Sequence, residues 1–307
     1  MFRAVDAGKR SLTDAGVMAN VPEVRAIDVP GFLRRLAVPG AEEPSVAALT
    51  RLHEAFVERV PYEALEIQLG RRTTLDPFDS ADRIIGQRRG GYCYHLNGAF
   101  AGLLRALGYR VTLHRAGVQN LGAPAEISRN HLALTVSGLP DDPGTTWLVD
   151  VGLGDALFSP LPLRTGRYAQ GPFTFGLRPS AIAPGGWHFD HDPRGSFLGM
   201  DFDPAPATMS DFASRHEYLS TDPASGFVRV CVVQRRHAGG CDSLRARTLT
   251  RVDGTRSSTR VFTTVDEWFD ALDEVFGISS ALFTPAERDR LWHQVTEQHE
   301  AHLSRRS

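Results

Sequence analysis

The chain has 307 residues, of which 42% are hydrophobic and 23% charged, which is enough material for two or three compact units of ordinary globular composition. The net charge is −2 and both signs are interspersed, so neither nucleic acid nor an anionic membrane is indicated as a partner. No apolar run of about 18 residues predicts a membrane span, and the first residues lack the apolar core of a signal peptide. We therefore expect a soluble, cytoplasmic protein.

The first hundred residues predict mainly helix. Residues 1–25 are weakly patterned and predict a loose extension. From Val46, apolar residues recur at helical spacing, and Pro61 ends this helix. The segment 60–100 then predicts turns and short helices.

The middle of the chain changes from helix to strand. A helix is predicted to begin at or near Cys93 and to stop before Gly108, a typical left-handed cap. Beyond it, residues 110–119, 131–138 and 145–152 alternate or run apolar over the length of strands. This pattern predicts an all-β region.

The last part of the sequence is mixed. Residues 164–205 are rich in glycine, proline and aspartate, and predict irregular structure with short strands. Two further strands are expected at 227–235 and 243–252. Capping-box signatures at Thr264 and Thr284 then predict two C-terminal helices.

The three cysteines predict neither a disulfide framework nor a zinc ribbon. Cys93, Cys231 and Cys241 are odd in number and show no Cys-x-x-Cys spacing, so we expect reduced thiols. A group of acidic residues and histidines could suggest a metal site, but no helix or strand spacing organises it, and we expect a solvated loop. Its members are His188, His191, Asp192, Asp201 and Asp203.

The segment RRGGYCYHLN, residues 88–97, places Cys93 at a predicted helix start. A helix N-terminus offers unpaired N–H groups and partial positive charge, which stabilise a thiolate. Gly90 and Gly91 would let the backbone bend and bring amides close to an oxyanion. Alternatively, the glycines only make a turn and Cys93 fills a gap in the core. Spacing alone leaves both interpretations open.

A thiolate nucleophile also needs a base and a group that orients the base. His131 begins a predicted strand, and Asp150 ends an apolar run that should bury its carboxylate, where a charge needs a partner. Neighbouring strands would set the two side by side. Taken singly, His131 could be a surface or satisfied histidine and Asp150 a turn residue. With Cys93 they form a Cys/His/Asp set at element boundaries.

Other charged or titratable groups lie close to Cys93 in the sequence. His95 is two residues away and would point to a different side of the helix, so it is a poor base for the thiol, although it could hold the loop or line a cleft. Glu63 and Arg89 are a candidate buried ion pair that would fix the Cys93 loop. Spacing alone does not show that they meet.

Four segments together resemble the arylamine N-acetyltransferases. In chain order they are VPYEALEIQLGR, RRGGYCYHLNGAF, NHLALTV and WLVDVGLGDALFSPLPL, and the resemblance runs from about Ala48 and weakens in the last hundred residues. It implies an α+β fold with a cysteine-protease-like Cys/His/Asp triad. The implied parts are a helical bundle (1–107), a central β-barrel (108–212) and an α/β lid (213–307), with the active site between the first two.

The resemblance makes Cys93 the acyl-accepting nucleophile, His131 its base and Asp150 the orienting carboxylate. The implied reaction is ping-pong transfer of an acetyl or other acyl group from a CoA thioester to a small amine of the arylamine type. It requires acetyl-CoA or another acyl thioester as co-substrate, no tightly bound cofactor and no metal.

The resemblance also implies residues that support the site or bind substrate. The supporting residues are Glu63, Arg89 and Asn97; Gly152 and Gly154 would border the acyl-donor cleft with Ser128 near its mouth, and Tyr62 and Leu153 would shape the acceptor pocket. Three features depart from the family pattern. His95 replaces an acidic or amide residue, Leu153 stands where an aromatic is frequent, and the 19 residues from His131 to Asp150 are a few more than usual.

Three alternatives remain open. Amide synthases that release or cyclise a polyketide-type chain share this fold, so an acyl carrier protein could supply the acyl group; neighbouring polyketide or peptide synthetase genes would favour this. A cysteine hydrolase would release its product to water. A non-catalytic binding module would have an unreactive Cys93. The oligomeric state is not indicated.

Overall fold

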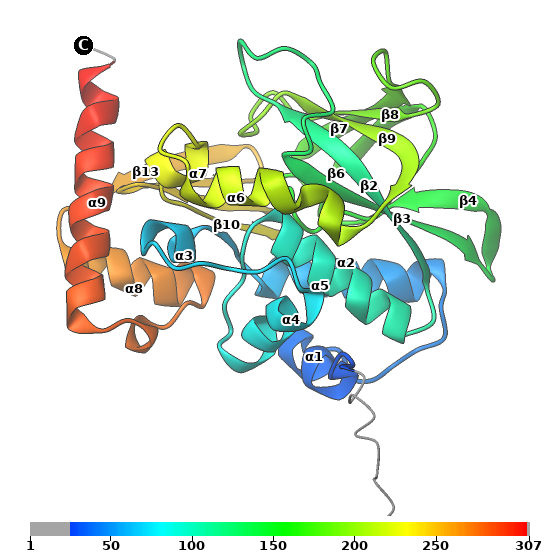
Figure 1. Ribbon diagram of the computed structural model, residues 1–307, viewed down its shortest axis with the longest axis horizontal. Helices are drawn as coiled ribbons and strands as arrows, with labels where there is room; N and C mark the ends of the chain where they lie inside the picture. The colour runs from blue at the N-terminus through cyan, green and yellow to red at the C-terminus, as the bar shows by residue number, and fades with distance from the viewer. Residues whose placement is uncertain (1–24, 306–307) are drawn as a thin grey trace, which may run out of the picture.

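The computed structural model describes residues 25–305 and has helices and two sheets (Figure 1). The helices are α1 (Val29–Leu36), α2 (Val46–Arg59), α3 (Leu65–Gln68), α4 (Pro77–Gly86), α5 (Cys93–Ala106), α6 (Ala213–Thr221), α7 (Gly226–Arg229), α8 (Val265–Phe276) and α9 (Pro285–Ser304), with short 3₁₀ helices η1 (Met209–Phe212) and η2 (Ser280–Leu282). Apart from Arg25, the predicted extension lies outside the described residues. No helix within 25–305 has the length and apolar character needed to cross a membrane.

Helix α5 is the centre of the N-terminal helical part. Eleven of its fourteen residues are buried, which is expected for a helix that is apolar on all sides. Helix α2 packs beside it through Phe56, whose ring centroid lies 5.0 Å from that of Phe100. As predicted, α2 ends just before Pro61, and Gly108 follows α5 with a left-handed φ of 88°.

The larger sheet has eight antiparallel strands that form a nearly closed barrel (Figure 1), in the order β5-β4-β3-β2-β9-β8-β7-β6. The strands are β2 (Arg110–Gln119), β3 (His131–Leu139), β4 (Asp142–Leu148), β5 (Leu161–Pro162), β6 (Gly166–Gln170), β7 (Phe173–Pro179), β8 (Trp187–Asp190) and β9 (Gly199–Ala207). The predicted α+β class with a central β-barrel is confirmed. Residues 164–205 contain more strand than the sequence indicated, because this glycine- and proline-rich stretch pairs into a meander.

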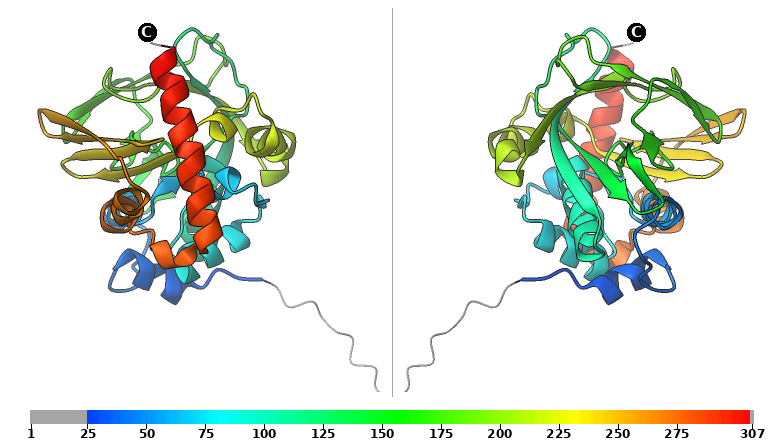
Figure 2. Two further views of the ribbon diagram at one scale, coloured as in Figure 1. Left: turned by 90° about the vertical axis from the view of Figure 1, so that its left-hand side faces the viewer. Right: turned by 90° about the vertical axis from the view of Figure 1, so that its right-hand side faces the viewer.

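The smaller sheet has five strands in the order β1-β10-β11-β12-β13. These are β1 (Tyr62–Glu63), β10 (Val232–His237), β11 (Gly240–Arg245), β12 (Thr248–Asp253) and β13 (Arg256–Val261). Since β1 comes from the N-terminal helical part and pairs with β10, this sheet connects that part to the C-terminal part of the chain. Helix α9 covers one side of the molecule (Figure 2). The division at 107 and 212 stays a prediction.

The C-terminal part differs from the predicted elements in two places. Residues 227–229 belong to α7 and not to a strand, because the Ser225 side chain caps a helical turn there. The expected strand 243–252 is two strands, since Ala246 has a left-handed φ of 50° that turns the chain between β11 and β12.

The predicted capping boxes form to different extents. Thr284 and Glu287 make the complete reciprocal pair, with Pro285 in the first turn of α9. At α8, the Thr264 side chain accepts from the Glu267 amide, but the Glu267 carboxylate accepts from the amide of Thr263. Only half of that box is present.

Candidate active site

Cys93 is the first residue of α5 and only 2% exposed. Its Sγ donates to the carbonyl oxygen of Asn130, 3.6 Å away. The preceding residue, Tyr92, has an extended backbone and no capping side chain, so the first amides of the helix have no side-chain acceptor there. The thiol therefore lies within the electropositive start of a buried helix.

The glycines before Cys93 allow a close approach of backbone segments. A Cβ at Gly90 would lie 1.7 Å from the carbonyl oxygen of Pro61, and one at Gly91 would lie 2.6 Å from Nη2 of Arg83. The amide of Glu63 donates to the Gly91 carbonyl at 2.9 Å, which ties this loop to β1. Neither glycine has a positive φ, so what this site requires of them is space.

His131 and Asp150 meet as the sequence indicated. Nε2 of His131 lies 2.7 Å from Oδ2 of Asp150, and both side chains are buried. Burial alone would lower the pKa of His131, but the Asp150 carboxylate and the Cys93 side chain, by charge and by hydrogen bonding, raise that pKa to about 10. The ring is therefore an imidazolium at neutral pH, and Nδ1 is the nitrogen left for the thiol.

Asn97 and the main chain hold the Asp150 carboxylate. Its Oδ1 accepts from Nδ2 of Asn97 at 2.7 Å and from the amide of Gly152 at 2.9 Å. Asn97 also donates to the carbonyl of Leu132 and accepts from the amide of Val151. One amide side chain on α5 thus fixes the start of β3 and the segment after β4, which carry the histidine and the carboxylate.

The loop after Asp150 packs directly on the cysteine. A Cβ at Gly152 would lie 2.8 Å from Cα of Cys93 and 2.9 Å from Nδ2 of Asn97. Gly154 has a left-handed φ of 65°, and a Cβ there would lie 2.1 Å from Oε1 of Gln234. Between them, Leu153 is buried in the apolar cluster inside the barrel.

The two remaining predicted substrate residues come from other elements. Tyr62 on β1 is half-buried, with its ring centroid 6.3 Å from that of Phe227, and burial followed by the nearby Cys93 raises its pKa well above the usual value. Ser128 lies in the loop between β2 and β3. This loop crosses β2 at Gly117, where a Cβ would lie 3.0 Å from the amide nitrogen of Ser128.

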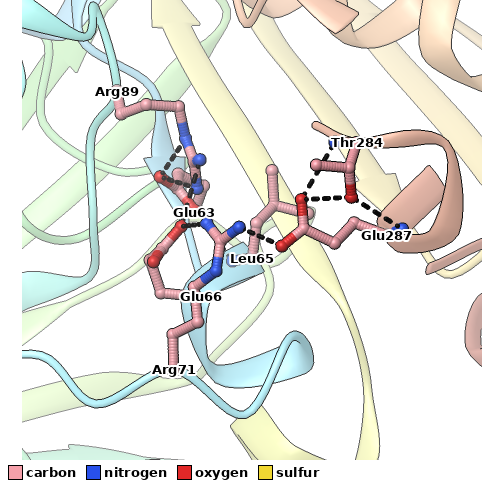
Figure 3. A network of polar contacts seen from close by, with 7 residues as sticks. All are labelled: Glu63, Leu65, Glu66, Arg71, Arg89, Thr284 and Glu287. Carbon is pink, nitrogen blue, oxygen red and sulfur yellow. Dashed lines mark hydrogen bonds and ion pairs between the residues drawn. The ribbon is translucent and has the colours of Figure 1, made fainter. Parts of the chain in front are cut away.

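The structure brings Glu63 and Arg89 together (Figure 3). Nε and Nη2 of Arg89 both lie 2.9 Å from Oε1 of Glu63, and both side chains are buried. Nη1 of Arg89 lies 3.2 Å from Glu66, which also pairs with Arg71. Arg71 in turn pairs with Glu287 at the start of α9. The network connects the loop before Cys93 to the C-terminal helix.

His95 has a different environment from His131. Its ring lies edge-on to Tyr92 (4.7 Å between centroids) and to His216 (5.7 Å). Burial, with the charge of Arg83, lowers the pKa of His95 well below its usual value, so the ring is neutral. Within residues 25–305, neither ring nitrogen has a hydrogen bond of good geometry, although the main chain of Thr74 lies near.

The expectation of a solvated loop around the acidic and histidine group is wrong. Pairing of β8 with β9 buries His188 and Asp201, whose Nδ1 and Oδ2 lie 2.9 Å apart. His191 is also buried and lies 3.3 Å from Oδ1 of Asp155. In the described part of the chain, no three histidine, cysteine or acidic side chains are grouped so as to hold a metal.

Sequence reasoning missed Asn130. Its side chain accepts from the amide of Val118 and donates to the Val118 carbonyl, at 2.8 and 3.1 Å, while its own carbonyl accepts from Cys93. It therefore fixes the loop that ends at His131. The only signal was its position directly before the histidine.

Comparisons with known proteins point to one family. A family model described as N-acetyltransferase matches residues 45–282. The arylamine N-acetyltransferase of Mycobacterium bovis is 32% identical over 66% of this chain and 72% of its own length. The Nocardia farcinica enzyme structure is 30% identical (TM-score 0.77; 86% and 93% covered), and the Mycobacterium marinum structure in complex with CoA is 26% identical (TM-score 0.78; 87% and 98% covered).

Proposed function

Because the chain belongs to the arylamine N-acetyltransferase family, we propose that it moves the acetyl group of acetyl-CoA to the amino group of a small arylamine, by way of an acetyl-Cys93 intermediate. The observation that carries the proposal is the buried His131–Asp150 pair, 2.7 Å apart, beside a cysteine at a helix start. The CoA complex of the M. marinum relative supports a CoA thioester as the donor, and the reaction needs no tightly bound cofactor.

In the first half-reaction, the Cys93 thiolate is paired with the His131 imidazolium. The sulfur attacks the carbonyl carbon of acetyl-CoA, and a new carbon–sulfur bond forms as the bond to CoA breaks. His131 gives its proton to the leaving CoA sulfur. Free CoA departs and a neutral imidazole faces the acetyl thioester.

In the second half-reaction, the arylamine nitrogen attacks the acetyl carbon. Neutral His131 takes the amine proton, and the bond to Sγ of Cys93 breaks. The products are the N-acetyl arylamine and the restored thiolate–imidazolium pair. Asp150 stabilises the charged ring in both halves, and its carboxylate is itself hydrogen-bonded to Asn97 and Gly152.

The surrounding residues have supporting roles in this proposal. Glu63, Arg89 and Asn97 hold the catalytic residues in place. Gly152, Gly154 and Ser128 bind the acyl donor. Tyr62 and Leu153 bind the amine acceptor. A buried ion pair suits the first role, because Arg89 belongs to the cysteine loop and its pairing with Glu63 ties that loop to β1. A cytoplasmic location stays a prediction.

The decisive test is acetylation of the purified protein. After brief incubation with acetyl-CoA and no acceptor, intact mass and peptide mapping should show one acetyl group on Cys93, which is discharged when an arylamine is added. Cys93→Ala should lose acetyl transfer by at least about 10³-fold while remaining folded. Cys231→Ala is the matched control, since burial raises the pKa of that thiol to about 12 and it should stay unacetylated.

Two other outcomes are informative. Wild-type activity in Cys93→Ala would refute the mechanism. A Cys93 that is rapidly alkylated but not acetylated would point to a larger or carrier-bound acyl donor, and thus to an amide synthase.

A further inference from the structure

We propose that strand β10 positions the donor-binding loop 151–156 through two side chains, Arg236 and Gln234. This inference rests on the proposed function, because it assigns donor binding to that loop. It concerns residues far from the triad in sequence and on a different sheet. Neither touches the reacting atoms, so both are positioning residues.

Arg236 joins three segments of the chain by hydrogen bonds to main-chain carbonyls. Nε donates to Ala156 at 2.8 Å and Nη2 to Gln170 at 2.8 Å. Nη1 donates to Gly240 at 2.7 Å and to His237. The segments are the loop that follows Asp150, strand β6 of the barrel, and the turn from β10 to β11.

Two phenyl rings also flank the buried side chain of Arg236. The side chain is 1% exposed, and its Cζ lies 5.4 Å from the ring centroid of Phe158 and 4.9 Å from that of Phe173. Burial lowers its pKa to about 10, which is still high enough to keep the guanidinium charged at neutral pH. An apolar side chain would fill this space at a lower desolvation cost, so the geometry points to the carbonyl contacts as the role of the cation.

Gln234 contacts the same loop from the same face of β10, because residues two apart on a strand point the same way. Its Oε1 lies where a side chain on Gly154 would have to be, and its Nε2 donates to Ser243 at 2.8 Å. In the β1–β10 ladder it is opposite Tyr62. The loop thus packs against Gln234 at residue 154 and is hydrogen-bonded to Arg236 at residue 156.

These anchors act on the loop more than on the triad. Asp150 has its own bonds to Asn97, Gly152 and His131, so it should stay in place when Arg236 is changed. At the far end of the loop, Arg236 bonds the Ala156 carbonyl, and the neighbouring Asp155 carboxylate accepts from Ser196. Loss of the anchor should therefore weaken donor binding while leaving the thiolate–imidazolium pair intact.

The test uses Arg236→Lys in the full chain. Lysine keeps the charge but not the fork geometry, so it cannot bond all three segments at once. We expect the KM for acetyl-CoA to rise about tenfold while kcat changes less than about threefold. Hydrogen exchange of the amides of residues 152–156 should become faster, and the pH profile of Cys93 alkylation should not move. Arg235→Lys, on the same strand and ion-paired with Asp242, is the control and should leave all four readings unchanged.

A lower melting temperature with unchanged KM and unchanged loop exchange would overturn the proposal, because Arg236 would then be structural only. If Arg236→Lys does not fold, Gln234→Leu carries the test: it should raise the KM for acetyl-CoA and speed loop exchange, and no change in either would overturn the proposal. If wild-type Cys93 is not acetylated by acetyl-CoA, the proposed function fails, but the exchange comparison still decides whether β10 positions the loop.

Discussion

The two sides of Cys93 differ in charge although both contain a buried histidine. His131 and His95 are each 2% exposed. On one side, the carboxylate of Asp150 raises the pKa of His131 to about 10 against the effect of burial. On the other side, no carboxylate among residues 25–305 accepts from His95, and burial together with Arg83 lowers its pKa well below the usual value. Equal burial therefore produces an imidazolium in one place and a neutral imidazole in the other.

This difference shows which histidine can assist the thiol. A buried group takes the charge that its neighbours favour, so the nearest carboxylate decides the outcome more than distance along the sequence. His95 is close to Cys93 in sequence, but it is His131 that is paired with a carboxylate, which outweighs burial and stabilises its charged form. Single substitutions can test this difference in charge between His131 and His95.

The largest effect is expected when the asymmetry is removed with Asp150→Asn. An amide cannot stabilise the imidazolium, so the pKa of His131 should fall and acetyl transfer should drop by roughly 10³- to 10⁴-fold. The rate of Cys93 alkylation, measured against pH, should shift to higher pH, because the thiolate loses its charged partner. An unchanged alkylation profile would contradict the role given to Asp150.

A smaller loss is expected from Gly152→Ala, which would force the loop after Asp150 and the start of α5 apart. The added Cβ would lie 2.8 Å from Cα of Cys93, so either the loop or the helix must shift. A displacement of about 1 Å at a catalytic site can cost about 10²-fold in rate. Gly144→Ala in β4 is the control, since a Cβ there meets nothing within 4 Å and activity should be retained. Equal activity of the two variants would contradict the close packing.

The smallest effect on activity, less than about threefold, is expected from His95→Leu, because His95 packs against Tyr92 and His216 and has no part in the proposed proton transfers. Steady-state rates of acetyl transfer for the variant and the wild type, compared at one pH, test this directly. A loss similar to that of Asp150→Asn would mean that both histidines serve the thiol.

The same variant should change how stability depends on pH. The folded pKa of His95 lies below its unfolded value of about 6.5, so the unfolded chain binds the extra proton and the free energy of unfolding falls as pH drops below that value. Removing the histidine should reduce this slope by up to about 1.4 kcal/mol per pH unit. Urea unfolding of both proteins between pH 5 and 8 measures it, and parallel curves would contradict the neutral state of His95.

Local signals were sufficient for the elements that carry Cys93 and His131, whereas Asp150 lies beyond β4, which ends at Leu148 and does not reach residue 152 as predicted. Helical periodicity and Pro61 defined α2, and apolar spacing after Cys93 defined α5. Strands β2 and β3 began where the alternation began. The longer spacing from His131 to Asp150 is taken up by the β3–β4 hairpin, with a bulge after Ser137.

The remaining features depend on contacts between distant segments, which no local pattern records. Strand alternation places Arg235 and Arg236 on opposite faces but does not show which of them is buried; Arg235 is half-buried beside Asp242 and Arg236 is fully enclosed. A glycine is required at position 90 because the carbonyl of Pro61, 29 residues earlier, lies against it. Composition likewise did not predict that His188 is buried against Asp201. Such sites follow from tertiary packing.

The link from Arg89 through Glu66 and Arg71 to Glu287 also bears on how the protein is made. Arg89 in the cysteine loop is synthesised 198 residues before Glu287, the last member of its supporting network. Chains fold as they emerge from the ribosome, N-terminal parts first, and contacts of high sequence separation form late. The nascent chain therefore carries an incompletely braced thiol until α9 has been synthesised, and a protein truncated before α9 would lack that brace permanently.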